Sequence, residues 1–325
     1  MTSNRIQLDR LLYTHYQHPN LHPVKNFCAD FGLIEVSESD GLIYFRGFGE
    51  NPCIYIAEQS QDSKKHFVGA GWAVPAYTDL EKAAALPSAS PIQLSTVPGG
   101  GSYVEIPDPN GVIIRLHHGV QYKGIAAAER PEPVITNTWL EKPRRGMFQR
   151  FERGASRVHK LGHYGILVKQ DDFDRTLEWY KSTFSLVPTD SVYDTHSGAD
   201  IMTFCHIDKG EQFTDHHSFF ISASPIGTGG SRVHHSSFEV DDVESQTLGH
   251  YHLEKQGWTN CWGIGRHVLG SQIFDYWFDY SGNILEHYTD GDIVNCHTKT
   301  SRHPAVPETM AVWGPNVSAA FMTGG

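Results

Sequence analysis

Apolar and polar positions in the second half of the chain follow one plan twice. Residues 171–184 carry apolar side chains every three or four positions behind an acidic start, and 241–256 form a similar stretch closed by Gly257, so both predict helices. Short strand-like runs precede and follow each helix. They are 161–169, 187–193, 200–207 and 217–223 for the first helix, and 233–240, 263–267, 273–280 and 284–288 for the second. One helix placed early among four strands, twice over, predicts a duplicated β-α-β-β-β unit.

The first half of the chain carries a weaker copy of the same plan. Residues 27–33 parallel 180–186 where a helix ends, and 108–115 parallel 279–286 at the last strand of a unit. We therefore expect an α+β chain of two homologous domains, each made of two β-α-β-β-β units. Because the helices are too few for a doubly wound parallel sheet, each domain should form a mixed or antiparallel sheet, curled as a half-barrel around a cavity.

Proline and charge interrupt this plan between the two halves. The segment 124–160 contains Glu-Arg-Pro-Glu-Pro and Lys-Pro-Arg-Arg-Gly, and no apolar stripe runs through it, which is typical of an exposed connector. The predicted division is an N-terminal domain at 1–135, a connector at 136–160, a C-terminal domain at 161–292 and a tail at 293–325.

Composition narrows the class of function. The chain has 325 residues, enough for two domains, and 39% of them are hydrophobic, which supports a sizeable core. A formal net charge of −11 argues against a nucleic-acid or anionic-membrane partner, and no apolar run is long enough to span a bilayer. The N-terminus lacks the apolar run of a secretory signal, and the five cysteines form no CxxC pair. We therefore expect a cytoplasmic protein.

Three residues stand at corresponding places in the repeated units and could bind a metal. His163 lies on the first strand of one unit, His235 on the first strand of the next, and Glu286 on the last strand of that unit. If the units curl into a half-barrel, these strands present their inward side chains to one cavity. Two imidazoles and one carboxylate are the ligand set of non-haem Fe(II) oxygenases. Because side chains alternate along a strand, we expect the adjacent His234 to point away from the cavity.

Several segments resemble those of the type I extradiol ring-cleaving dioxygenases, of the vicinal oxygen chelate superfamily that includes the glyoxalases. The segments similar to the family's ligand segments are Leu161-Gly162-His163, Arg232-Val233-His234-His235 and Ser281-Gly282-x3-Glu286-x-Tyr288. Further similar segments are Asp215-His216-His217, Gly265-Arg266-His267, Phe274-Asp275-Tyr276 and Trp313-Gly314. The resemblance covers residues 159–292 well and residues 8–120 weakly. It implies four β-α-β-β-β units in two domains, with Fe(II) in the C-terminal domain alone.

The resemblance also implies a reaction and the residues that perform it. O2 is the co-substrate, and a small catecholic substrate of aromatic catabolism undergoes meta ring cleavage. His217 is the expected acid and base, because an imidazole can take and return protons near neutral pH. His267 and Tyr276 are expected to hydrogen-bond a substrate hydroxyl. We expect Fe(II) rather than Mn(II) as the metal, and a homo-oligomer.

The N-terminal domain departs from this pattern. Arg115 stands where a carboxylate ligand would be expected, and Gly69 or Val68 where the second histidine would be, although His15 could take the first position. A degenerate domain without metal is therefore expected. Gly227–Gly230 inserts a turn ahead of the histidine pair, which leaves the identity of the substrate open.

Two other functions remain compatible with the sequence. One is a glyoxalase-like isomerase or thiol transferase that uses Zn, Ni or Mn, with His217 as a fourth ligand. The other is a non-catalytic binding protein of the same fold, for which the three ligands, His217, His267 and Tyr276 would all be surplus. The metal content of the purified protein would separate these functions.

Overall fold

The first half of the chain forms one sheet with two helices. The strands are β1 (Arg10–His18), β2 (Ile34–Ser39), β3 (Leu42–Arg46), β4 (Tyr55–Gln59), β5 (His66–Ala73), β6 (Gln93–Leu94), β7 (Ser102–Pro107) and β8 (Ile113–His118), and the helices are α1 (Leu21–Phe31) and α2 (Tyr77–Ala84). The strand order is β2-β3-β4-β1-β5-β8-β7-β6. The computed structural model describes residues 4–125, 130–224 and 231–324, so the expected turn at Gly227–Gly230 lies outside the described residues.

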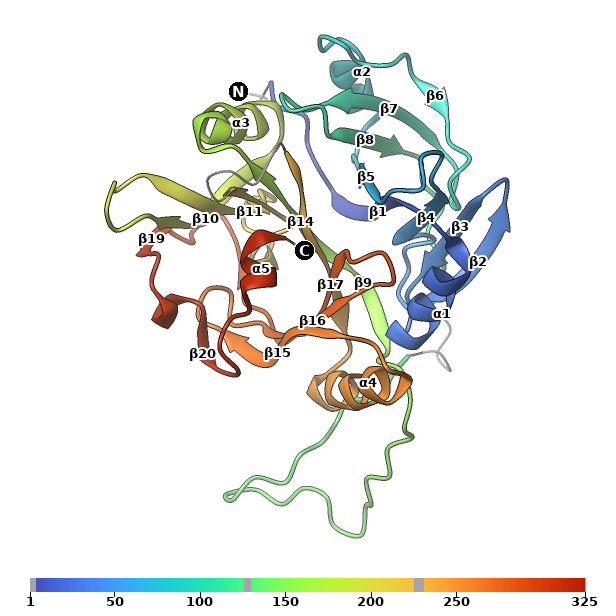
Figure 1. Ribbon diagram of the computed structural model, residues 1–325, viewed down its shortest axis with the longest axis vertical. Helices are drawn as coiled ribbons and strands as arrows, with labels where there is room; N and C mark the ends of the chain where they lie inside the picture. Colours follow the sequence, from blue (N-terminus) through green and yellow to red (C-terminus); the bar gives the residue numbers. More distant parts are fainter. Residues whose placement is uncertain (1–3, 126–129, 225–230, 325) are drawn as a thin grey trace.

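The second half forms a larger sheet beside the first (Figure 1). Its strands are β9 (Val158–Val168), β10 (Leu186–Tyr193), β11 (Asp200–Ile207), β13 (Phe219–Ala223), β14 (Arg232–Val240), β15 (Asn260–His267), β16 (Ile273–Phe278), β17 (Ile284–Thr289), β19 (Ser301–Pro304) and β20 (Ala311–Trp313). The helices are α3 (Gln170–Thr183), α4 (Val243–Gln256) and α5 (Ala319–Thr323), and β12 (Thr214–Asp215) pairs separately with β18 (Ile293–Val294). The strand order is β19-β10-β11-β13-β9-β14-β17-β16-β15-β20.

Strand pairing repeats through the four units. The first strand of each unit lies parallel to the last, which pairs β1 with β4, β5 with β8, β9 with β13 and β14 with β17. In each sheet the two first strands, β1 and β5 or β9 and β14, pair antiparallel at the centre. The expected α+β class with mixed sheets is confirmed. The domain boundaries at 135, 160 and 292 stay predictions.

Local sequence signals explain where the long helices begin and end. The Asp242 side chain accepts a hydrogen bond from the backbone N–H of Ser245 and starts α4, which ends at Gly257 with φ of 86°. Gly32, with φ of 98°, ends α1 in the same way. The longest helices have 14 residues, and none of the described helices is long and apolar enough to cross a bilayer.

The two halves share one continuous core, and this shared packing positions β17. The rings of Phe31 and His287 stack with centroids 3.7 Å apart, and the Nε2–H of His287 donates to the Phe31 carbonyl at 2.7 Å. Tyr16 and Ser236 hydrogen-bond through their hydroxyls at 2.6 Å. The strand that carries Glu286 is therefore held by both halves of the chain.

Two strands from residues 293–324 extend the second sheet at its edges. β19 extends one edge by pairing with β10, and β20 extends the other by pairing with β15. Helix α5 packs Phe321 against Trp262, Tyr276 and His235. The segment expected to be a tail thus forms part of the wall around the centre of the sheet.

Candidate metal centre

Three neighbouring strands bring His163, His235 and Glu286 together. His163 on β9 lies opposite Ser237 on β14, and Ser237 lies beside Glu286 on β17. The two Nε2 atoms are 3.2 Å apart, and they lie 3.3 Å and 3.4 Å from the Oε2 atom of Glu286. All three side chains are buried. The three residues that the sequence predicted as ligands therefore meet at one point.

The donor atoms suit a divalent metal ion. Glu286 is fully buried, yet neither carboxylate oxygen has a partner with hydrogen-bond geometry among the described residues. Leaving a buried carboxylate without partners is costly, unless a cation binds it. Ligands held about 2.1 Å from an ion at right angles to one another lie about 3 Å apart. The observed spacing of the three atoms is close to that value, so the residues fit a metal with open positions on its other side.

The protonation states are also those of metal ligands. Burial opposes ionisation of Glu286, but the adjacent imidazoles of His163 and His235 outweigh it and hold the pKa of the carboxyl below its usual value. Burial lowers the pKa of His163 to about 4, against the opposing effect of Glu286. An ionised carboxylate and a neutral imidazole are the forms that bind metal.

The expectation for His234 is wrong. Its side chain is buried and lines the same cavity as His235. The pairing of β14 with β9 shifts register between Val233 and His235, because a β-bulge leaves His234 without an opposite residue. A bulge breaks the alternation of side chains on which the expectation relied. His234 Nδ1 lies 2.8 Å from His235 Nδ1, so it can accept the N–H of His235 when the Nε2 atom of His235 binds metal.

We expect His234→Ala to weaken metal binding about 10–100-fold, the usual cost of losing a partner that orients a ligand. A metal-competition titration of the purified variant measures this change. His234→Asn should recover part of the affinity, because its amide oxygen can still accept the N–H of His235. His252→Ala, which alters a histidine of α4 that is hydrogen-bonded to Asp30 of α1 and is not among the site residues, is the matched control. Equal affinity in His234→Ala and wild type would contradict this role.

His217 stands beside the three-residue cluster and is oriented by a chain of hydrogen bonds. Its ring centroid is 4.0 Å from that of His163, and its Nδ1 lies 3.0 Å from Nδ1 of His216, whose Nε2 lies 2.7 Å from Asp190 Oδ2. Burial raises the pKa of Asp190, but His216 and Ser301 outweigh it and hold that pKa below its usual value. An ionised Asp190 accepts Nε2–H of His216, so Nδ1 of His216 accepts Nδ1–H of His217.

These hydrogen bonds leave the Nε2 lone pair of His217 free. Nε2 has no hydrogen-bond partner among the described residues, and His217 lines the cavity. Burial, together with His163 and His216, lowers the pKa of His217 well below its usual value. The resting side chain is therefore a neutral base that faces the cavity.

His267 and Tyr276 form a second oriented pair. His267 donates from Nδ1 to the Met310 carbonyl at 2.9 Å, so its Nε2 accepts the Tyr276 hydroxyl at 2.8 Å. Burial and the nearby Glu286 raise the pKa of Tyr276 well above its usual value, which keeps the phenol protonated. Tyr276 also packs against His235, with centroids 5.1 Å apart. The structure thus brings all six predicted site residues into one region.

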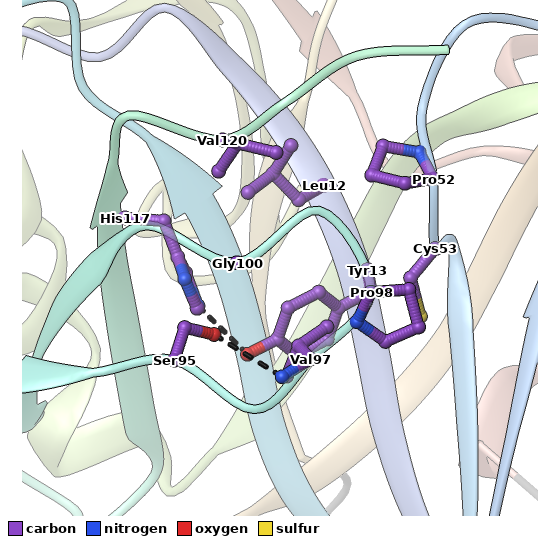
Figure 2. A pocket seen from close by; sticks show the side chains of 10 residues that line it. All are labelled: Leu12, Tyr13, Pro52, Cys53, Ser95, Val97, Pro98, Gly100, His117 and Val120. Atoms are coloured by element: carbon purple, nitrogen blue, oxygen red, sulfur yellow. Dashed lines mark hydrogen bonds between the residues drawn. The ribbon is translucent and has the colours of Figure 1, made fainter.

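The pairing register of the strands identifies the residues of the first sheet that correspond to the three predicted ligands. Tyr13 lies opposite Gly71, which lies beside Arg115, and the adjacent bulges match those of β9 and β14. The counterparts of His163, His235 and Glu286 are therefore Tyr13, Gly69 and Arg115, and the expectation that His15 holds the first position is wrong. Figure 2 shows Tyr13 among its neighbours, with its hydroxyl 2.9 Å from His117 Nε2.

The first sheet has little space at this place. The pocket around Tyr13 and His117 measures about 10 Å³. Arg115 pairs with Glu105 and lies 2.8 Å from His15 Nδ1, so a cation occupies the place of a carboxylate ligand. Among the described residues, His163, His235 and Glu286 form the one group with metal-ligand geometry.

Sequence reasoning missed the residues that orient the site. Asp190 and His216 hold His217, His234 holds His235, and Met310 holds His267. The neighbouring histidine pairs at 216–217 and 234–235 were visible signals for two of them. Asp190 and Met310 lie far along the chain from their partners, and no local pattern marks them.

Comparison with curated sequences finds a relative that matches half of the chain. Over 164 residues the chain is 28% identical to Metapyrocatechase 2 of Cupriavidus necator. The match covers 50% of this chain and 47% of the relative, so the chain spans about half the length of the curated relative it matches. No protein-family profile matches the chain.

Comparison with solved structures establishes the fold. Homoprotocatechuate 2,3-dioxygenase from Arthrobacter globiformis superposes with a TM-score of 0.78 at 15% identity, over 99% of this chain and 93% of that chain. The Mn(II)-bound glyoxalase from Novosphingobium aromaticivorans superposes with a TM-score of 0.76 at 16% identity, over 97% and 94%. The chain has the vicinal oxygen chelate fold, and the resemblance expected from its motifs is confirmed.

Proposed function

We propose, from the fold that this chain shares with extradiol ring-cleaving dioxygenases, that it is an Fe(II)-dependent enzyme of the same class. It would insert O2 into a catecholic substrate and open the ring beside the two hydroxyls. The observation that carries the proposal is the convergence of His163, His235 and Glu286 on one point beside a cavity. Two histidines and one carboxylate with open positions favour Fe(II) over Mn(II).

When bound by these three residues, iron supplies the redox chemistry that allows O2 to react with an organic ring. His217 supplies the proton transfer. Its free Nε2 accepts a proton from a catechol hydroxyl, and the protonated ring can later return that proton to the product. The link through His216 to the Asp190 carboxylate stabilises the positive charge of the protonated ring.

Tyr276 and His267 would orient the substrate. The Tyr276 hydroxyl donates to His267, so its oxygen is free to accept a hydrogen bond from a catechol hydroxyl. Phe220 and Phe204 pack against His235 and His217 and form an apolar wall on this side of the centre. A bound aromatic ring that displaces water from this wall would strengthen each electrostatic interaction nearby.

The test uses the purified chain loaded with Fe(II) without oxygen. Catechol, 3-substituted catechols and 2,3-dihydroxybiphenyl are added, oxygen is admitted, and oxygen uptake and a yellow ring-opened product are followed. We expect stoichiometric iron and consumption of O2 in step with product. Tightly held zinc with no O2 uptake would contradict the proposal.

The second candidate is a glyoxalase-like enzyme, because the Mn(II)-bound glyoxalase superposes almost as well. That function calls for His217 as a fourth ligand. His217 is not in the group of three residues whose ligand atoms converge on one point. This placement favours the dioxygenase. We further propose a cytoplasmic enzyme with no nucleic-acid or membrane partner, and a homo-oligomeric assembly.

A further inference from the structure

The cavity beside the metal centre is far larger than one aromatic ring requires. It measures about 1370 Å³. A cavity of about 150 Å³ accepts benzene, and pockets for drug-sized ligands span about 300–1,000 Å³. A single-ring catechol would leave most of this space to water. The space therefore indicates a substrate with a large substituent.

The cavity runs away from the metal along two strands. Phe204 and Phe220 are paired across β11 and β13 and pack on His217 and His235. Met202 and Ser222, the next inward pair, lie two residues further along these strands, which is about 7 Å. Phe321 of α5 forms part of the opposite wall. An apolar substituent would follow this path when the hydroxyls lie at the metal.

Charge in the cavity is scarce and lies at its rim. Among the described residues that line it, Lys169 is the one Lys or Arg, and it is exposed at the start of α3 beside exposed Asp171. Asp194 adds a second carboxylate. A substrate carboxylate buried near the metal would have no cation to pair with, and burying it unpaired is costly. The lining therefore disfavours acidic catechols.

We propose that the substrate is an uncharged catechol that carries a bulky apolar substituent, either a second ring or an alkyl chain. This inference rests on the proposed dioxygenase function. The cavity volume, the apolar wall from α5 and the absence of a buried Lys or Arg among the described lining residues each point to the same class.

A substituent series tests the inference. Binding of catechol and of 3-methyl-, 3-propyl- and 3-hexylcatechol is measured anaerobically by calorimetry, and kcat/KM is measured with oxygen. We expect affinity and kcat/KM to rise about four-fold per buried methylene. 3,4-Dihydroxyphenylacetate should bind at least about ten-fold more weakly than uncharged 4-ethylcatechol. A flat series, or preference for the acid, would overturn the inference.

A variant that fills part of the cavity provides a second test. Ser222→Phe should lower the ratio of kcat/KM for 3-hexylcatechol over catechol by at least about ten-fold, because the new ring occupies the path of the chain. Ser37→Phe, on exposed β2, is the control and should leave the ratio unchanged. An unchanged ratio in Ser222→Phe would overturn the assigned path. Size-dependent binding without any O2 uptake would instead contradict the dioxygenase function and leave the cavity preference intact.

An independent observation concerns the arm, which we define as residues 130–157. Most of it runs out past α4 and back, away from both sheets (Figure 1), and only its last residues, such as Ser156, are buried against the rest of the chain. Gln149 donates to the Ile135 carbonyl at 2.9 Å, and Asn137 accepts the backbone N–H of Arg144 at 2.9 Å, so hydrogen bonds join its two sides. Its large apolar side chains are nonetheless exposed: Trp139 at 89%, Phe148 at 76% and Leu140 at 73%. Such side chains on one projecting element mark an interaction site.

The charge of the arm identifies its partner. The arm holds seven Lys or Arg and three Asp or Glu, whereas the rest of the chain holds 19 and 34. A basic, aromatic arm is complementary to the acidic surface of its own protein, and that acidic surface would repel a nucleic acid. We infer that the arm docks on a second copy of this chain.

The oligomeric state of the protein tests whether the arm docks on a second copy. Sedimentation velocity at several protein concentrations should show an oligomer for wild type, and largely monomer for the double variant Trp139→Ser, Phe148→Ser. Leu94→Ser is the matched control, because Leu94 is 83% exposed outside the arm. Circular dichroism checks that each variant is folded. Monomeric wild type, an oligomer that survives the double variant, or binding of the arm to double-stranded DNA would each overturn the inference.

Discussion

Glu286→Ala is expected to abolish tight metal binding while leaving the fold intact. Glu286 supplies the one negative charge among the three ligands, and its oxygens have no hydrogen-bond partner among the described residues. Without it, two neutral imidazoles remain, and such a pair does not retain iron through purification. Metal analysis of the purified variant measures the loss.

Stability provides a second readout for the same residue. Glu286→Gln keeps the size of the buried side chain but removes the negative charge that would bind a cation. In the presence of metal, the melting temperature of wild type should rise and that of the variant should not. Glu239→Gln, whose carboxylate pairs with Lys160 on β9, should keep its metal. Stoichiometric iron in Glu286→Ala would remove the residue from the ligand set.

His217→Gln is expected to retain iron and catechol and to lose turnover by about 10²–10⁴, the usual worth of a positioned proton-transfer group. His217 lies outside the three-residue cluster, and its Nδ1 is held by His216. Binding without oxygen and turnover with oxygen are measured on the same preparation. Loss of iron in this variant would make His217 a fourth ligand and would favour the glyoxalase-like function.

The hydrogen bonds that run from His217 through His216 to Asp190 provide a graded control for this prediction. His216→Gln leaves His217 in place but removes the imidazole link to Asp190. We expect a fall in kcat smaller than that of His217→Gln, with catechol binding unchanged. An equal fall in both variants would mean that His216 takes part in proton transfer itself.

The secondary structure and the three predicted ligands could be derived from sequence because they depend on local periodicity. The helices at 171–184 and 241–256 and the flanking strands appear in the structure with shifts of a few residues at their ends. His163, His235 and Glu286 could be picked out because a duplicated unit places equivalent strands side by side, so position in the repeat predicts position in space.

Only the tertiary structure decided the features that depend on register and on distant partners. The alternation rule put His234 outside the cavity, but a bulge, which is set by how β14 fits against β9, turned it inward. The same kind of bulge made Tyr13, and not His15, the counterpart of His163. Asp190 and Phe321 reach the site from strands and a helix far away in the chain. A sequence specifies which side chains a strand offers, but the packing of one strand on another decides which of them meet.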